Sequence, residues 1–321
     1  MIALFAGLVF AQNVRAQQVP LYSQYVLNSF LLNPAIAGSS GYTMFNVVAR
    51  EQWIGIENSP KTYALSFHTR IMPNSYIKRR RPVKRKFNYG FTSGNVGMGA
   101  YVFSDRVGSL NRTGMRLSYA YHLSNKSDGS QISFGFSLLA YQLNFNDDKV
   151  ILRDPDDEVW YTARESVFIP DADVGIYYSN PQMYVGLSVD QVMESAIKFG
   201  DTGFDQYKLD RNYYLYGGYD IEIDRKYILE PSLLVKVTEN GAFQGDISLK
   251  VYYDMSYWLG LTYRTGDAMI AMAGLSFDKY VVGYAYDFSM SSIMRRSYGS
   301  HEFVFALRLG ENSRRYRWLN R

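Results

Sequence analysis

Three histidines are the side chains of this chain that could act as general bases, and each has a serine nearby in the sequence. The histidines are His68, His122 and His301, and the serines are Ser66, Ser118 and Ser300. A hydrolase would need one histidine within hydrogen-bond reach of its serine. Closeness in the sequence does not establish this, because the members of a catalytic triad meet in space and not in chain order. We therefore predict that the chain is not an enzyme.

Metal and cofactor sites are not predicted either. The chain has no cysteine, and its histidines include no i, i+4 pair of the kind that binds zinc on a helix. The loop 147–158 carries carboxylates that could hold calcium: Asp147, Asp148, Asp154, Asp156, Asp157 and Glu158. This loop lacks the glycine of an EF-hand, so a solvated acidic loop is the favoured interpretation, and calcium binding stays open.

A strongly basic run lies between residues 78 and 86. Its cationic side chains are Lys78, Arg79, Arg80, Arg81, Lys84, Arg85 and Lys86. Such a run is usually solvated, and the functional alternative is a docking site for acidic periplasmic partners or lipid phosphates. No aromatic residues interleave the run, so nucleic-acid binding is not predicted. The basic tail 311–321 has the same two interpretations.

The elements that must position these residues are short segments in which apolar and polar residues alternate. In 246–253, for example, Ile247, Leu249 and Val251 share one face, and Asp246, Ser248 and Lys250 share the other. A strand has a side-chain period of two, so each segment has one apolar and one polar face. The predicted strands are 42–50, 61–69, 95–104, 112–122, 130–142, 170–179, 182–190, 211–220, 226–236, 243–253, 256–264, 269–277, 280–288 and 300–309.

These segments predict an all-β fold, a transmembrane antiparallel β-barrel of about 14 strands in the outer membrane. Each segment has about the length that crosses a bilayer at a tilt. The chain has 29 Tyr and 19 Phe, which suit the aromatic girdles of such barrels. A Tyr-rich soluble β-sandwich or sugar-binding protein is the alternative.

Glycines at 94–99 lack the Lys and Ser/Thr of a P-loop, and on a strand they make room for bulky neighbours.

The sequence divides into four predicted regions. Residues 1–16 resemble a signal peptide, with an apolar run and a small-residue cleavage site at Val14-Arg15-Ala16. Residues 17–40 alternate too little for a strand, so we expect a plug-like segment beneath or inside the barrel. Its key residues are Tyr22, Gln24, Tyr25, Asn33 and Pro34. The barrel occupies 41–310, and 311–321 form a basic periplasmic tail.

The lengths of the connections predict an orientation. An even number of strands places both ends of the barrel sequence in the periplasm. Tight links at 180–181, 221–225, 254–255 and 278–279 would be periplasmic turns, and the long links 143–169, 191–210 and 289–299 would be extracellular loops. The link 70–94 breaks the rule, since it is long and periplasmic by parity. Long loops carry partner contacts more often than turns.

Trp53 falls in the first predicted extracellular loop, with Arg50 and Gln52 nearby. Trp is more often a girdle anchor in such barrels. The functional alternative is that Arg50 and Trp53 contact a secreted partner, because Trp and Arg are enriched in binding hot spots.

Once a barrel is predicted, an ordered series of motifs resembles the PorP/SprF family of type IX secretion outer-membrane proteins. The motifs are Tyr22-Ser23-Gln24-Tyr25, Asn28, Asn33-Pro34-Ala35-Ile36-Ala37-Gly38-Ser39, Arg50-Glu51-Gln52-Trp53-Ile54-Gly55, Ser59-Pro60-Lys61-Thr62, Asp105-Arg106-Val107-Gly108, Pro170-Asp171-Ala172-Asp173-Val174-Gly175, Tyr184-Val185-Gly186-Leu187-Ser188, Tyr284-Ala285-Tyr286-Asp287 and Gly299-Ser300-His301-Glu302. The series spans nearly the whole chain after the predicted signal peptide. The resemblance is weakest in the tail.

The resemblance implies a barrel that accompanies the secretion of large cell-surface proteins. The implied partners are outer-membrane lipid, a secreted surface protein with a type IX sorting domain, such as a gliding adhesin, and secretion components on the periplasmic side. The barrel would bind or help export its partner without catalysis and without a cofactor. The alternative function is a porin or a substrate-specific channel, because a fourteen-strand lumen can conduct unless it is filled.

Overall fold

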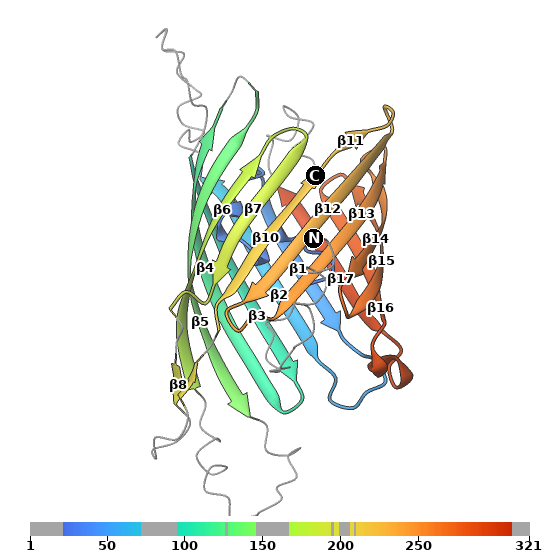
Figure 1. The fold of residues 1–321 in the computed structure, drawn as a ribbon. Coiled ribbons are helices and arrows are strands. Elements are labelled where there is room, and N and C mark those ends of the chain that lie inside the picture. Colours follow the sequence, from blue (N-terminus) through green and yellow to red (C-terminus); the bar gives the residue numbers. More distant parts are fainter. Residues whose placement is uncertain are drawn as a thin grey trace, which may run out of the picture.

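The computed structural model describes residues 22–71, 95–125, 128–145, 167–193, 196–198, 206–208 and 210–309. Fourteen long strands in this part of the chain form one antiparallel barrel (Figure 1). They are β1 Thr43–Glu51, β2 Lys61–Ile71, β3 Val96–Val107, β4 Leu110–Ser124, β5 Gln131–Phe145, β6 Val167–Ser179, β7 Met183–Asp190, β10 Asn212–Tyr219, β12 Tyr227–Thr238, β13 Phe243–Tyr253, β14 Tyr257–Arg264, β15 Ala268–Phe277, β16 Tyr280–Ser289 and β17 Ser300–Leu309. The predicted fold and strands are confirmed.

The barrel is closed by two pairings that the alternation of residues alone could not show. The first and last strands, β1 and β17, pair antiparallel from Thr43 with Leu309 to Glu51 with His301. On the opposite side, β10 pairs with β12. The short strand β11 (Ile221–Glu222) extends this region and pairs with β12. A separate hairpin, β8 (Ala196–Lys198) with β9 (Gln206–Lys208), was not predicted.

The apolar face of each strand points outward and the polar face points into the lumen. On β14 the outward side chains are Tyr257, Leu259, Leu261 and Tyr263, which are 59%, 68%, 60% and 44% exposed. Aromatic rings thus lie at both ends of the strand and leucines lie between them, as expected for a bilayer-spanning surface with two girdles. The inward residues Trp258, Thr262 and Arg264 are buried. None of the helices in the described ranges is long and apolar enough to cross a membrane.

The two ends of the barrel differ in their connections. We call the end that holds the start of β1 and the finish of β17 the terminal end, and the opposite end the long-loop end. The terminal end has the tight links at 180–182, 254–256 and 278–279, and the longer link at 72–95. The long-loop end has the links 146–166, 191–211 and 290–299, but it also has tight turns at 108–109, 239–242 and 265–267. Long links therefore occur at both ends of the barrel, and at the long-loop end they occupy only part of the rim.

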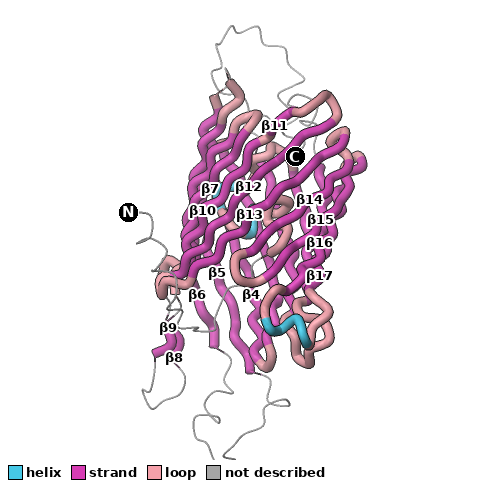
Figure 2. Tube along the Cα trace, turned by 45° about the vertical axis from the view of Figure 1, so that its right-hand side comes forward, coloured by secondary structure: helices cyan, strands magenta, loops and turns pink. Residues whose placement is uncertain are grey.

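Before β1, residues 22–42 run along the inner surface of the barrel, and we call 22–40 the inner segment. It contains two short 3-10 helices, η1 (Ser29–Leu31) and η2 (Pro34–Ile36), which lie behind the front strands in Figure 2. Asn33 precedes Pro34 in extended backbone, and its side chain caps η2 by accepting from the Ala35 N–H. The predicted signal peptide and the tail 311–321 lie outside the described residues.

Candidate functional site in the lumen

The first residues of the inner segment are fixed to the barrel wall by a group of charged side chains, which we call the charged anchor. It consists of Arg50 on β1, Asp287 on β16, Glu302 on β17, and Ser23. The backbone N–H groups of Ser23 and Gln24 donate to the two carboxylate oxygens of Glu302 at 2.7 and 2.8 Å. The Ser23 hydroxyl donates to Asp287 Oδ2 at 2.7 Å.

Arg50 neutralises both carboxylates of the charged anchor. Its Nη2 lies 2.7 Å from Asp287 Oδ2, and its Nη1 lies 3.0 Å from Glu302 Oε2. Arg50 Nη1 also donates to the Ser23 hydroxyl. Arg50 and Glu302 face each other directly across the β1–β17 pairing, and they are only 2% and 0% exposed. Arg50, expected at a partner-contacting rim, instead lies inside the barrel, where such a contact cannot form without rearrangement.

Two further arginines continue this pattern of paired charges around the lumen. Arg264 donates to Asp246 on the neighbouring strand at 2.9 Å. On the other side, Arg116 Nε lies 2.9 Å from Asp173, and Arg116 Nη1 donates to the Leu31 carbonyl oxygen of the inner segment at 3.0 Å. Buried charges are costly unless they are paired, and these two arginines are paired with carboxylates, Arg264 with one on the adjacent strand and Arg116 with one on the next strand but one.

The second half of the inner segment lies over four wall glycines, which we call the glycine seat. They are Gly97 and Gly99 on β3, Gly135 on β5 and Gly175 on β6. A Cβ at Gly97 would lie 1.8 Å from the Ala37 carbonyl oxygen, and one at Gly135 would lie 2.1 Å from the Ala35 nitrogen. Only glycine lets the two backbones approach so closely. The glycines at 97 and 99 therefore make room for a neighbour, as predicted.

Asn33 and the two histidines near it bind the backbone at this seat. Asn33 Nδ2 donates to the carbonyl oxygens of Ile176 on β6 and Leu187 on β7, at 3.0 and 3.1 Å. His122 Nε2 lies 2.9 Å from the Ala37 carbonyl oxygen, and the Gly38 N–H donates to His68 Nδ1 at 3.1 Å. His68 and His122 thus hold the inner segment.

The remaining predicted plug residues also face the wall. The Tyr22 and Tyr101 hydroxyls are 3.0 Å apart, and the Tyr25 hydroxyl donates to Ser232 Oγ on β12 at 3.5 Å. Pro34 is buried at the start of η2. The sequence places these residues near one another, but the register of distant strands decides what they touch.

The serines near the histidines do not form a triad within the described ranges. His122 Nδ1 lies 2.8 Å from Ser133, whereas Ser118 pairs with Ser137 at 2.7 Å and Ser66 binds Asn28 at 3.2 Å. No group of three or more His, Asp or Glu side chains suited to a metal ion occurs among the described residues. The basic run 78–86 and the acidic loop 147–158 lie outside them.

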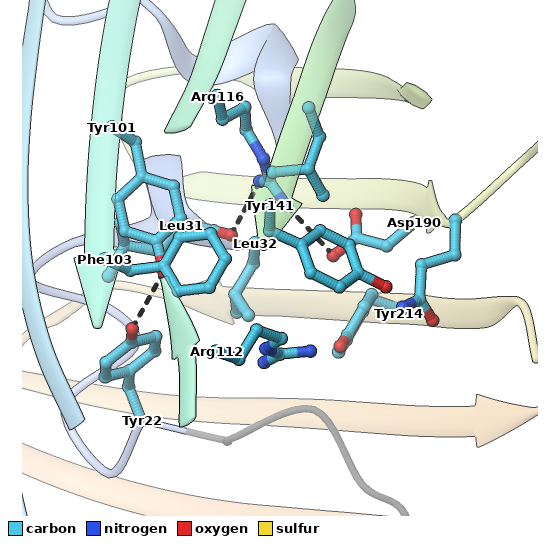
Figure 3. Close-up of a pocket in the computed structure, with 12 residues that line it drawn as sticks. Tyr22, Leu31, Leu32, Tyr101, Phe103, Arg112, Arg116, Tyr141, Asp190 and Tyr214 are labelled. Carbon is cyan, nitrogen blue, oxygen red and sulfur yellow. Dashed lines mark hydrogen bonds and ion pairs between the residues drawn. The ribbon is translucent and has the colours of Figure 1, made fainter. Parts of the chain in front are cut away.

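A small cavity, whose lining residues are drawn in Figure 3, lies between the inner segment and strands β3, β4, β5, β7 and β10. Its volume is about 40 Å³, enough for a few water molecules or one small polar group. It is lined by Tyr22, Leu31, Leu32, Tyr101, Phe103, Arg112, Arg116, Leu139, Tyr141, Asp190, Gln191 and Tyr214. Aromatic rings and two arginines dominate this lining, which sequence alternation alone could not bring together from five strands.

Trp53 lies in the loop that follows β1, at the long-loop end. It is half-buried and has a positive φ of 50°. Its backbone N–H donates to Ser300 Oγ at 3.1 Å. The loop 52–60 is joined to the loop 290–299 by two backbone hydrogen bonds, from Ile54 to Gly299 at 2.9 Å and from Tyr298 to Ile54 at 2.7 Å. The two loops form one surface, which we call the joined-loop surface.

The model of the type IX secretion system membrane protein PorP/SprF family matches residues 14–307 of the chain. The chain belongs to the PorP/SprF family. It is therefore an outer-membrane component of type IX secretion, and the family resemblance of the motifs is confirmed. Family membership and the barrel fold both point to a non-enzymatic secretion component.

Several solved outer-membrane proteins are similar to the chain at low sequence identity. Acinetobacter baumannii outer membrane protein Omp33 is 7% identical, with a TM-score of 0.42 over 84% of this chain and 100% of that one. A mutant of the monoaromatic hydrocarbon channel TodX is 8% identical, with a TM-score of 0.44 over 87% and 92%. The β domain of the Bordetella autotransporter BrkA is 11% identical, with a TM-score of 0.36 over 84% and 100%. No curated protein matches the chain.

Proposed function

We propose that this PorP/SprF-family barrel holds a partner surface protein during type IX secretion, and that the partner does not pass through its lumen. The observation that carries this proposal is the inner segment. It is fastened by the charged anchor at one end and by the glycine seat at the other. A segment fastened inside the barrel in this way supports a binding role over the role of an open porin.

The joined-loop surface supports a contact at the long-loop end, which we take to be extracellular. Tyr298 is 77% exposed, and Met290 and Met294 are 57% and 48% exposed. Arg295 and Arg296 beside them are also exposed. Tyr, Met and Arg are enriched at protein interfaces, and the hydrogen bonds between the loops present these residues on an ordered backbone. Trp53 belongs to the same surface.

The other contacts belong to the same proposal. The basic run 78–86 would face type IX components in the periplasm, because its link is at the terminal end. The partner would be a secreted surface protein with a type IX sorting domain, such as a gliding adhesin. Outer-membrane lipid would surround the exposed apolar belt.

Co-purification tests the partner contact. Tagged protein would be extracted gently from its native outer membrane, and the recovered proteins would be identified by mass spectrometry. We expect a large surface protein in near-stoichiometric amount with the wild type, and loss of most of it with Tyr298→Ala combined with Met294→Ala. The matched control is Ile223→Ala, at an exposed position of the terminal end. Recovery of the barrel alone from wild-type cells would contradict the proposal.

A cross-link tests whether the lumen stays closed. The chain has no native cysteine, and the Asn28 and Ser66 side chains are hydrogen-bonded at 3.2 Å, so Asn28→Cys with Ser66→Cys brings two thiols near each other, and non-reducing electrophoresis shows whether a disulfide ties the inner segment to β2. We expect secretion of the partner to continue with the disulfide formed, and wild-type protein in a planar bilayer to show no stable conductance. Secretion that stops on oxidation and returns on reduction, or a large wild-type conductance, would favour the channel alternative.

A further inference from the structure

The outward face of strands β2–β5 changes from apolar to polar as the strands approach the long-loop end. Direct cross-strand partners lie side by side on one face of a sheet, so the registers of these four strands define rows of outward-facing side chains. From the middle of the barrel toward the rim, three successive rows are Leu65, Val102, Met115 and Ala140, then Tyr63, Ser104, Thr113 and Gln142, and then Lys61, Arg106, Asn111 and Asn144. We call the last two rows the polar edge.

The last row of the polar edge lies beyond the level of the aromatic girdle. Tyr63 is 47% exposed and occupies the position of a girdle residue on β2. Two residues of a tilted strand rise roughly 5 Å, so Lys61 lies that much further from the centre of the bilayer. On β14–β16, in contrast, the last outward-facing side chains are Tyr263, Met269 and Phe288. The polar edge is therefore a feature of one sector of the wall.

The polar edge also carries positive charge. Glu51, Lys61 and Arg106 are the only outward-facing Lys, Arg, Asp or Glu side chains on the described lengths of the fourteen long strands. Lys61 and Arg106 are direct cross-strand partners, and like charges in such positions repel. Glu51 offsets one of them, since its Oε1 lies 2.9 Å from Lys61 Nζ. Arg106 is exposed, and its guanidinium has no ion pair within the described part of the chain. The row therefore has a surplus positive charge that an anion would balance.

The surroundings of Arg106 and Lys61 indicate which anion this is. Both side chains point out of the barrel at the level of lipid headgroups, where Lys and Arg bind phosphate. An arginine has five N–H donors and a lysine has three, so donors remain after the pairing of Lys61 with Glu51. The hydroxyl and amide side chains of the polar edge can bond the hydroxyl groups of a sugar, and the apolar row beneath them can contact acyl chains. A phosphorylated and acylated sugar carries these three kinds of group in one molecule.

We propose that the polar edge binds a phosphorylated glycolipid of the outer leaflet, of the lipid A class. The phosphate accepts from Arg106 and Lys61, the sugar lies against the hydroxyl and amide side chains, and the acyl chains lie along the apolar row. The long-loop end is extracellular here, as in the proposed function. The site lies on the lipid-facing wall and needs no partner protein, so lipid binding and partner binding can fail separately.

Native mass spectrometry of the purified full-length barrel in detergent tests the site. The barrel is offered equal amounts of monophosphorylated lipid A, the same lipid without its phosphate, and phosphatidylglycerol. We expect the adduct with phosphorylated lipid A to be at least about ten-fold more abundant than that with the dephosphorylated form, because charge-assisted hydrogen bonds are lost with the phosphate. It should also exceed the adduct with phosphatidylglycerol, which has a phosphate but no sugar. Equal adducts in either comparison, or no adduct with any lipid, would overturn the proposal.

Substitutions assign the binding to the two cations. Arg106→Gln combined with Lys61→Gln should reduce the lipid A adduct to the level of the dephosphorylated form, and Arg106→Lys alone should keep more of it than Arg106→Gln, because the charge remains. The matched control is Arg225→Gln combined with Lys226→Gln, which removes the same charge from exposed positions at the terminal end and should leave the adduct unchanged. An equal loss in the control would show that net charge, and not the polar edge, attracts the lipid. If the double variant at the polar edge fails to fold, the comparison of lipids on wild-type protein still decides.

Discussion

The two ends of the inner segment are held to the same barrel by opposite physical means. At the charged anchor, Ser23 and Gln24 are held by directional bonds to buried ions. At the glycine seat, Ala35 and Ala37 lie so close to the wall that no side chain fits between the backbones. A charged contact fails when one partner is removed, and a close contact fails when an atom is added. The comparison therefore predicts different mutations for the two ends.

The largest effect is expected at the charged anchor. Arg50→Ala leaves Glu302 buried without its cation and Asp287 with only Arg264 Nη1 at 3.7 Å, which should lower the free energy of unfolding by about 3–5 kcal/mol. The measurement is the urea midpoint of the barrel in detergent. Adding Asp287→Asn and Glu302→Gln to this variant should recover much of the loss, because no buried charge is then unpaired. An Arg50→Ala midpoint equal to the wild type would show that the anchor does not hold the segment.

Adding a single methyl group at the glycine seat should lower the stability of the barrel. Gly97→Ala would place Cβ against the Ala37 carbonyl oxygen, a backbone atom that cannot rotate away, and should cost about 1–3 kcal/mol. The matched control is Gly245→Ala, another strand glycine, where the nearest atom to a new Cβ is at 3.4 Å. If both variants unfold at the same urea concentration, the seat is not a close-packed contact.

Asn33 is held by directional hydrogen bonds, as the charged anchor is, but it lies beside the close backbone contacts of the glycine seat. Asn33→Ala removes the two donations to Ile176 and Leu187 and the cap on the Ala35 N–H, and should lower the free energy of unfolding by about 1–2 kcal/mol. Asn33→Asp keeps the shape but turns a carboxylate toward two carbonyl oxygens, so it should be worse than alanine. The reverse order of the two urea midpoints would contradict the assigned amide orientation.

The smallest effect is expected for an exposed ion pair near the anchor. Lys61 and Glu51 lie 2.9 Å apart at the long-loop end of β2 and β1, and their side chains are 43% and 38% exposed. Lys61→Met should lower the free energy of unfolding by about 0.2–1 kcal/mol. Added salt should weaken the wild-type pair but leave Arg50 little affected, because buried pairs are poorly screened. A cost as large as that of Arg50→Ala would remove the distinction between surface and lumen charges.

The strands of this barrel were predictable because alternation is a local signal. The pattern at 246–253 separates exposed Ile247 and Leu249 from buried Asp246 and Ser248 without any knowledge of neighbours. The same signal could have placed Arg50, which shares the face of Asn46 and is two residues from buried Val48. Its closeness to Trp53 and the enrichment of Arg in binding hot spots suggested a partner contact instead. That interpretation did not use the period of the strand.

The contacts of the lumen were not predictable, because they depend on the register of strands far apart in the chain. Arg50 meets Glu302 only because β1 pairs with β17, and Ser23 reaches Asp287 across 264 residues of sequence. Gly97 is ordinary in its own strand, and its purpose becomes visible only with Ala37 above it. The hairpin β8–β9 was missed because its strands are only three residues long.

The path of the inner segment also has a mechanical consequence. It touches strands from β16, through β17 and β1, round to β7, and its Tyr25 reaches β12 on the remaining arc. A hollow barrel that is pulled from one side can flatten into an oval, because only hydrogen bonds between neighbouring strands resist the change in cross-section. Here the inner segment connects distant arcs of the wall, so its contacts also resist that change in cross-section. A load applied at one point of the rim is then shared with strands that are not its neighbours.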